Sequence, residues 1–154
     1  LMKNYITIFF LVLIDQITKY SVTQNLSLNE THYITNYLNL IYIENRGLIL
    51  GAFSGVNPNI MLLVHILLFI IALFVIKKFL YSYSELKNVA ILFYSGAIGN
   101  TIDRIFKEGV IDFIDFHYMG IHWPAFNLAD FLISLGVIIL IYKLFKGHGS
   151  ISLY

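Results

Sequence analysis

Four long apolar stretches dominate the pattern of hydrophobic and polar positions along the chain. They cover about residues 5–21, 58–76, 86–105 and 127–142. The second, PNIMLLVHILLFIIALFVI, is long enough as a helix to cross roughly 30 Å of hydrocarbon, and Pro58 suits a first helical turn. The pattern therefore predicts four transmembrane helices in a single integral-membrane domain, residues 1–154.

The first apolar stretch is also similar to the hydrophobic part of a cleavable signal peptide. However, Asp15 and Lys19 follow inside the same helical stretch, and the sequence has no small-residue cleavage site there. We therefore expect this segment to be retained as the first span.

Two segments between these stretches are rich in aromatic and polar residues. The segment at about 31–54 contains THYITNYLNLIYIENRG, which predicts two strands or a hairpin with a turn at Asn45-Arg46-Gly47. The segment at about 109–126 alternates weakly and turns at Met119-Gly120. Such backbone must satisfy its own hydrogen bonds, so we expect both segments at or above the membrane interface, where aromatic side chains gather.

Composition agrees with a membrane protein. Hydrophobic residues make up 58% of the chain and charged residues 12%, against roughly 45–50% and about 25% in soluble domains. The net charge of +1 does not indicate nucleic-acid binding. The absence of cysteine excludes disulfides, thiolate metal ligands and a cysteine nucleophile.

Lysines are distributed unequally between the two ends of the predicted helices. If the helices alternate in direction, one side carries Lys3, Lys77, Lys78, Lys87, Lys143 and Lys146. Since lysine-rich ends stay in the cytoplasm, we expect that side, with both termini, to be cytoplasmic. Of the nine carboxylates only Glu85 lies there, so we expect any chemistry at the outer face.

Asp15 and the motif GAIGNTIDR introduce polar groups into predicted helices. Asp15 is costly in lipid and is expected to face protein or water, with a structural pair to Lys19 at i+4 as the simplest interpretation. In GAIGNTIDR, Gly96 and Gly99 allow close helix contact. The other polar side chains of this motif, Asn100, Asp103 and Arg104, share one helical face. Two interpretations are open: a network between Asp103 and Arg104 at the helix end, or a cluster that supports catalytic carboxylates.

The motif FNLAD begins the last apolar stretch. Asn127 could cap that helix, with Asp130 near the positive end of its dipole. Asp112 lies 18 residues earlier, in an outer loop that could fold back. Two carboxylates that meet can share one proton, so that one activates water and the other polarises a carbonyl. Spacing alone leaves five candidates for such a pair: Asp15, Asp103, Asp112, Asp115 and Asp130.

The histidines are weaker candidates for chemistry. His117 and His122 flank the Met119-Gly120 turn, and a zinc site between them would need further ligands. His65 has no partner at metal-ligand spacing, so a packed or interface-seeking histidine is the simpler interpretation.

Five motifs resemble those of bacterial lipoprotein signal peptidase, also called signal peptidase II. In order along the chain they are DQITK (15–19), ENRGLILGAFSG (44–55), GAIGNTIDRI (96–105), GVIDFIDF (109–116) and WPAFNLADFLISLG (123–136). Each motif alone is a weak signal. Five of them in this order, covering the chain almost end to end, are specific.

The resemblance implies an aspartyl protease of the bacterial cytoplasmic membrane with four helices and an outer β-rich cradle. Such an enzyme cuts signal peptides from prolipoproteins just before a diacylglyceryl-modified cysteine and needs no metal or cofactor. The resemblance implies a catalytic pair at Asp112 and Asp130, with Asp115 as a solvated neighbour. It implies support of this pair or substrate contact at Asp15, Lys19, Asn45, Gly47, Asn100, Asp103, Arg104, Asn127 and Ala129. We expect contact with membrane lipids and a monomer.

One departure from the family pattern and two alternatives remain. The family usually has small residues after Asn-x-Gly, whereas Leu48-Ile49-Leu50 stand here and could reshape the substrate pocket. A paralogue that binds lipidated peptides without cutting them is therefore one alternative. The other is a proton or small-ion transporter that uses the intramembrane polar residues. The intramembrane polar residues that such a transporter would use are Asp15, Asp130, Arg104 and His65. However, the sequence lacks the internal repeats that transporters usually show.

Overall fold

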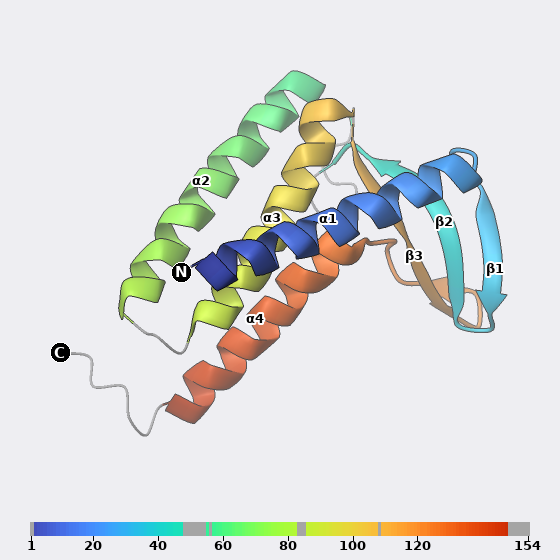
Figure 1. Cartoon of the computed structure of the whole chain (residues 1–154). Helices are drawn as coiled ribbons and strands as arrows, with labels where there is room; N and C mark the ends of the chain where they lie inside the picture. The colour runs from blue at the N-terminus through green and yellow to red at the C-terminus, as the bar shows by residue number, and fades with distance from the viewer. Residues whose placement is uncertain (1, 48–54, 56, 83–85, 108, 148–154) are drawn as a thin grey trace.

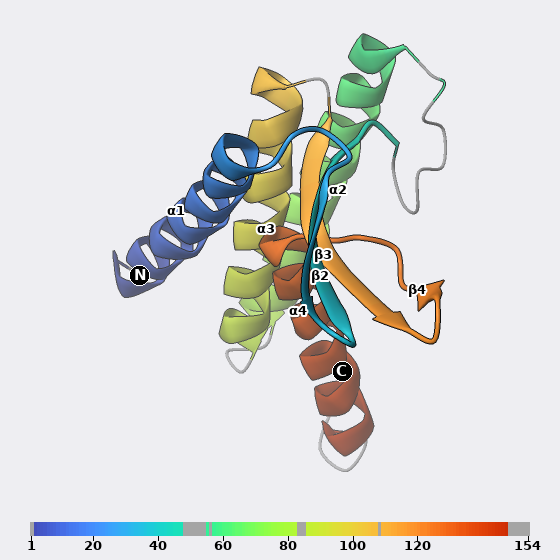
Figure 2. The same cartoon turned by 90° about the vertical axis from the view of Figure 1, so that its right-hand side faces the viewer.

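The computed structural model describes residues 2–47, 55, 57–82, 86–107 and 109–147, some of them by backbone alone. The elements are α1 (Met2–Asn25), β1 (Thr31–Thr35), β2 (Leu38–Asn45), α2 (Pro58–Ser82), α3 (Lys87–Phe106), β3 (Val110–Tyr118), β4 (Ile121–His122) and α4 (Leu128–Gly147). Helices thus occupy all four apolar stretches. Figures 1 and 2 show the sheet to one side of the helices, where α4 begins.

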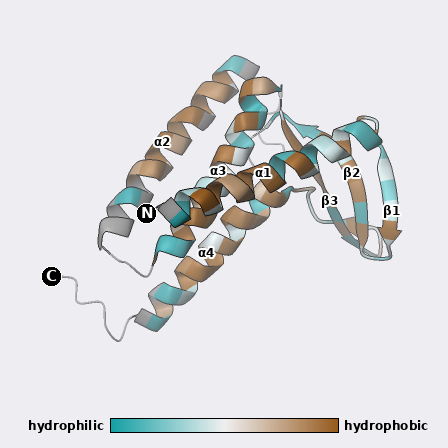
Figure 3. Cartoon of the chain, viewed as in Figure 1, coloured by the Kyte–Doolittle hydropathy of each residue, from teal (hydrophilic) through white to brown (hydrophobic). Residues whose placement is uncertain are grey.

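Many large hydrophobic side chains of α1, α2 and α4 are exposed. Figure 3 shows mostly hydrophobic residues along α2, α3 and α4, and a mixture of hydrophobic and hydrophilic residues on the sheet. By length and composition, one helix among the described residues, Lys3–Asn25, is suited to cross a membrane.

The four strands form one antiparallel sheet in the order β1-β2-β3-β4. Strand β2 pairs with β3 so that Ile43 lies opposite Asp112 and Asn45 opposite Val110. The predicted loop around Asp112 is therefore a strand, which gives this carboxylate a fixed direction.

The first outer segment forms a hairpin before the turn predicted at Asn45-Arg46-Gly47, and residues 48–54, which follow that turn, lie outside the described part of the chain. Strands β1 and β2 are joined at residues 36–37, where the Tyr37 backbone N–H donates to Thr35 Oγ1 at 3.2 Å. Asn45 still belongs to β2, and its side-chain oxygen accepts the Gly47 N–H at 3.0 Å. Asn45-Arg46-Gly47 thus forms a turn in which the asparagine side chain bonds the backbone at the end of β2.

The turn predicted at Met119-Gly120 is confirmed. It joins β3 to β4, and both residues have positive φ, 49° and 79°. Positive φ at both central positions suits a two-residue hairpin because its twist matches that of the strands.

Two close contacts bring the helices and the sheet together at one place. Gly96 on α3 packs so closely against α4 that an added Cβ would lie 2.6 Å from Ile133 Cγ1. Phe126, just before α4, pairs with β3 through three backbone hydrogen bonds, of which its N–H donates one to Ile114 O at 3.1 Å. The start of α4 is thereby held beside the strand that carries Asp112.

On the other face of β3, Ile111 and Phe113 form a buried cluster with Val22 of α1.

Candidate active site

The beginning of α4 forms a reciprocal cap between Asn127 and Asp130. Asn127 Oδ1 accepts the Asp130 backbone N–H at 2.9 Å, and Asp130 Oδ2 accepts the Asn127 backbone N–H at 3.3 Å. This is the geometry of a capping box, which satisfies free N–H groups of the first helical turn. The predicted cap is confirmed, and it also fixes the direction of the Asp130 carboxylate.

The cap does not use all of the Asn127 side chain. Its Nδ2 donates to Asp112 Oδ1 at 2.7 Å, and Asn45 Nδ2 donates to Asp112 Oδ2 at 3.0 Å. Each oxygen of the Asp112 carboxylate therefore accepts an amide N–H. Asn127 touches both aspartates, through its side chain to Asp112 and through its side chain and backbone to Asp130.

Asp130 receives a second donor from α3. Asn100 Nδ2 donates to Asp130 Oδ1 at 2.8 Å. With the Asn127 backbone N–H on its other oxygen, this carboxylate is also held at both oxygens. The two carboxylates come from different elements, β3 and α4, and are joined through asparagine amides.

The environment of Asp112 favours its protonated form. The residue is 3% exposed. Burial first, and then the nearby negative charge of Asp130, raise the pKa of Asp112 to about 7, against the opposing hydrogen bonds from Asn45 and Asn127. A carboxyl group in this range can hold or release a proton near neutral pH.

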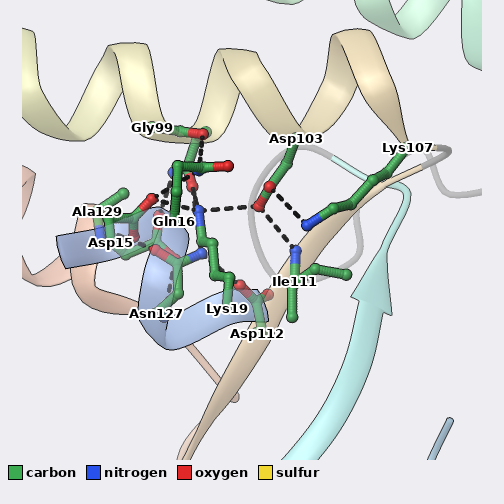
Figure 4. Close-up of polar contacts among 12 residues, drawn as sticks. Asp15, Gln16, Lys19, Gly99, Asp103, Lys107, Ile111, Asp112, Asn127 and Ala129 are labelled. Atoms are coloured by element: carbon green, nitrogen blue, oxygen red, sulfur yellow. Dashed lines mark hydrogen bonds and ion pairs between the residues drawn. The ribbon is translucent and has the colours of Figure 1, made fainter. Parts of the chain in front are cut away.

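Lys19 lies at the centre of a buried polar network next to this pair. Its ammonium group is 0% exposed and lies 2.9 Å from Asp15 Oδ2, 2.9 Å from Asp103 Oδ2 and 3.0 Å from Asn100 Oδ1. Figure 4 shows Lys19 reaching from α1 toward Asp103 on α3. The expected pair of Asp15 with Lys19 is present, and it is part of a larger network.

The outer members of this network connect it to the backbone and to the surface. Asp15 Oδ1 accepts the Ala129 N–H of α4 at 2.9 Å, and Asp103 Oδ2 accepts the Ile111 N–H of β3 at 3.2 Å. Half-buried Lys107 donates to Asp103 Oδ1 at 3.0 Å (Figure 4). The aspartates therefore tie α1, α3, α4 and β3 together.

Arg104 and Asp103 do not form the helix-end network that the sequence suggested. Asp103 is fully buried and pairs with two lysines, whereas Arg104 points elsewhere and donates to the Gly47 carbonyl oxygen at 2.6 Å. Because α-helical neighbours diverge by about 100°, adjacent residues rarely share partners. Arg104 Nε has no hydrogen-bond partner in the described part of the chain.

Comparisons with known proteins identify the family of this chain. The family model described as signal peptidase (SPase) II matches residues 7–146. A lipoprotein signal peptidase of Thermodesulfovibrio yellowstonii is 42% identical over 149 residues, which cover 95% of this chain and 97% of that protein. The chain belongs to the signal peptidase II family.

Further relatives and solved structures extend the likeness. The lipoprotein signal peptidase of Staphylococcus haemolyticus is 34% identical, with 96% of this chain and 97% of that protein covered. A bacterial membrane enzyme solved by the in meso method at 2.3 Å resolution is 27% identical and has a TM-score of 0.85, with 100% of this chain and 94% of that chain covered. Another, at 1.9 Å resolution, is 28% identical with a TM-score of 0.80, covering 95% and 94%. This member of the family is thus similar to bacterial membrane enzymes along nearly its whole length.

The family positions expected to form the site gather in one place. Those that contact one another directly are Asp15, Lys19, Asn45, Gly47, Asn100, Asp103, Arg104, Asp112, Asn127, Ala129 and Asp130. Sequence reasoning missed two further members. Lys107 had a usable signal, its i+4 spacing from Asp103. Gln16, which donates to Asp15 Oδ2 and to the Gly99 carbonyl oxygen at 3.1 Å each, also had one, because it is a polar residue of the motif DQITK inside a predicted span.

Asp115 is not the solvated neighbour that was expected. It is 5% exposed on β3 and bonds Asn39 Nδ2 and His122 Nδ1, each at 2.9 Å. Burial acts to raise the pKa of Asp115, but the hydrogen bonds from Asn39 and His122 outweigh it and lower that pKa. It lies apart from the Asp112 site because residues three apart on a strand point to opposite faces.

His117 and His122 do face each other, with ring centroids 5.1 Å apart. Within the described residues, however, no group of three or more His, Cys, Asp or Glu side chains could hold a metal ion. Leu48, Ile49 and Leu50, which were expected to reshape the substrate pocket, lie outside the described residues. The side chain of His65 is not described either.

Proposed function

We propose that this protein is a membrane aspartyl endopeptidase that removes signal peptides from diacylglyceryl-modified prolipoproteins, cleaving before the lipidated cysteine. One observation carries the proposal: the Asn127 side chain bonds both Asp112, at 2.7 Å, and the Asp130 backbone, at 2.9 Å. Two aspartates from separate elements are thereby held together at one polar site. Membership of the signal peptidase II family supports the substrate class.

The proposed reaction is general acid–base attack by water. The ionised carboxylate of the pair takes a proton from water, whose oxygen attacks the scissile carbonyl carbon. The protonated carboxyl gives its proton to the carbonyl oxygen, which forms a tetrahedral diol. The carboxyl that took a proton from water then gives it to the cysteine nitrogen, while the other carboxylate takes a proton from the diol. The C–N bond breaks, and the signal peptide is left with a carboxyl group.

The charges around the site support a pair that shares one proton. Besides the pair, the described network contains three positive charges and two negative charges. The cations are Lys19, Arg104 and Lys107, and the carboxylates are Asp15 and Asp103. The cluster is neutral when the catalytic pair adds one negative charge. A second ionisation would leave a net charge in a buried site, which is unfavourable.

The proposed membrane arrangement follows from lysines and apolar stretches. Four transmembrane helices would place both termini in the cytoplasm and the carboxylate pair at the outer face of the bacterial cytoplasmic membrane. There the diacylglyceryl group can stay in lipid while the peptide bond reaches the site. The protein is proposed to work as a monomer.

A cleavage assay tests this proposal. Purified protein in detergent is given a diacylglyceryl-modified prolipoprotein, and wild type is compared with Asp112→Asn and Asp130→Asn. Both variants are expected to fold and to lose cleavage. The matched control is Asp115→Asn, an aspartate of the same strand outside the site, which keeps cleavage. If wild type binds this substrate and never cuts it, the non-catalytic paralogue becomes the better interpretation.

A further inference from the structure

We propose that Lys19 is a positioning residue whose ammonium group fixes the orientation of the Asn100 side-chain amide, so that its N–H faces Asp130. The inference rests on the proposed function of the Asp112 and Asp130 pair. It assigns to a buried cation of α1 a specific role in the catalytic geometry of α3 and α4.

The ammonium group of Lys19 has no freedom to serve another partner. It has three N–H donors, and three acceptors lie within 3.0 Å of it: Asp15 Oδ2, Asp103 Oδ2 and Asn100 Oδ1. With the residue 0% exposed, water does not compete for these donors. Two of the contacts are ion pairs that stabilise the buried charge, and the third is a hydrogen bond to an amide.

The amide of Asn100 has one orientation that satisfies all its neighbours. Its Oδ1 accepts from Lys19 Nζ at 3.0 Å and from Asn127 Nδ2 at 3.2 Å, while its Nδ2 donates to Asp130 Oδ1 at 2.8 Å. A flipped amide would set its NH2 group against two donors and its oxygen against a carboxylate. Of the two hydrogen bonds that Asn100 Oδ1 accepts, the one from Lys19 is charge-assisted and therefore the stronger.

The direction of this chain of hydrogen bonds determines whether a donor or an acceptor faces the Asp130 carboxylate. Because Lys19 donates to Asn100 Oδ1, the Asn100 N–H faces Asp130. Among the described residues, the groups that bond the Asp130 carboxylate are N–H donors. Such donors stabilise the ionised form that takes a proton from water. The other charged groups around Lys19 and the pair are Asp15, Asp103, Arg104 and Lys107, and the positive charge of Lys19 also opposes the rise in the Asp112 pKa.

The first test is Lys19→Met, assayed on a diacylglyceryl-modified prolipoprotein peptide across pH. We expect kcat to fall by roughly 10²-fold with little change in KM, since the reacting groups lose their alignment. The acidic limb of the kcat profile should move to higher pH by about one unit, because a nearby cation is lost. Lys3→Met, which removes an exposed lysine from the same helix, is the matched control and should leave the profile in place.

A second pair of variants guards against misfolding, because Lys19→Met leaves the buried Asp15 without its cation and leaves Asp103 with Lys107 alone. The double variant Lys19→Met/Asp15→Asn removes a complete ion pair, which proteins tolerate better than half of one. Its reference is Asp15→Asn alone, which keeps Lys19 on Asn100. The acidic limb of the double variant should lie about one unit above that of its reference.

The outcomes separate this inference from the proposed function. If a folded Lys19 variant loses activity only in proportion to its folded fraction and keeps the pH profile of its reference, Lys19 is merely structural and the inference fails. If Asp112→Asn or Asp130→Asn still cleaves, the catalytic pair itself is wrong. A shifted profile, with both aspartate variants inactive, supports both proposals.

Discussion

Asn127 donates its side-chain N–H to Asp112 Oδ1 at 2.7 Å while its side-chain oxygen accepts the Asp130 backbone N–H at 2.9 Å. One fully buried asparagine thus starts a helix and orients a carboxylate of the neighbouring strand. A helix cap needs only the oxygen, so the amide nitrogen is available for the site. The two roles can be separated by substitution.

Asn127→Ser and Asn127→Ala should separate the cap from the contact to Asp112. Serine keeps a capping oxygen but loses the amide donor, whereas alanine loses both. We expect both variants to lose cleavage by roughly 10²-fold, and alanine alone to lower the free energy of unfolding by a further ~1 kcal/mol. Cleavage rates and thermal unfolding in detergent measure the two effects. Full activity of Asn127→Ser would show that the amide contact is dispensable.

The cleavage rate should depend on pH in a bell shape. The pKa of Asp112 is raised to about 7 by burial and by Asp130, so one limb of the profile is expected near neutral pH. The check is kcat against pH on the lipidated substrate, with chemistry rate-limiting. A rate that stays flat from about pH 4 to about pH 9 would contradict an acid–base pair.

The stability of the folded protein should fall as pH rises through the range in which Asp112 titrates. Its folded pKa, about 7, lies above the ordinary value of 3.8, so the unfolded chain binds fewer protons between these values. Ionisation therefore costs up to about 4 kcal/mol of stability above neutral pH. Asp112→Asn, which cannot ionise, should unfold at a higher temperature than wild type at pH 8. The two should converge near pH 4, and a constant difference would argue against a raised pKa.

Asp115 should show the opposite dependence on pH. Its pKa is lowered because hydrogen bonds from Asn39 and His122 outweigh burial, so its stabilising effect is present above the unfolded pKa and is lost as pH falls through the folded one. We expect Asp115→Asn to lower the free energy of unfolding by about 1–3 kcal/mol at neutral pH. The difference from wild type should shrink in acid below about pH 4. A difference in the free energy of unfolding that grows in acid would show that the pKa of Asp115 is raised and not lowered.

Gly99→Ala should push α3 away from its neighbours. A Cβ at this position would lie 2.5 Å from Asp15 Oδ2 and 3.3 Å from Ala129 Cβ, so we expect a loss of roughly 1–3 kcal/mol from overpacking. The matched control is Gly55→Ala, where no atom of the described residues lies within 4 Å of the added Cβ. Thermal unfolding of both variants in detergent checks this. Equal unfolding temperatures for the two would mean that the helices can separate without cost.

Several features of the site were within reach of sequence reasoning. The Asn127 cap, the Met119-Gly120 turn and the close contact at Gly96 each depend on a few neighbouring residues, and each is present. Strand alternation also carried a signal that was not used. Asp112 and Asp115, three apart on one strand, must point to opposite faces.

The four helices, the Asn127 cap and the Met119-Gly120 turn follow from the amino-acid sequence alone, because apolar patterning, capping oxygens and turn residues act over a few neighbouring positions. Only the tertiary structure decided which carboxylates meet. The contacts Asn45 to Asp112, Lys19 to Asp103 and Asn100 to Asp130 join residues far apart in the chain. No local preference selects among five aspartates. The pairing depends on the register of β2 on β3 and on the backbone bonds that hold Phe126 against β3.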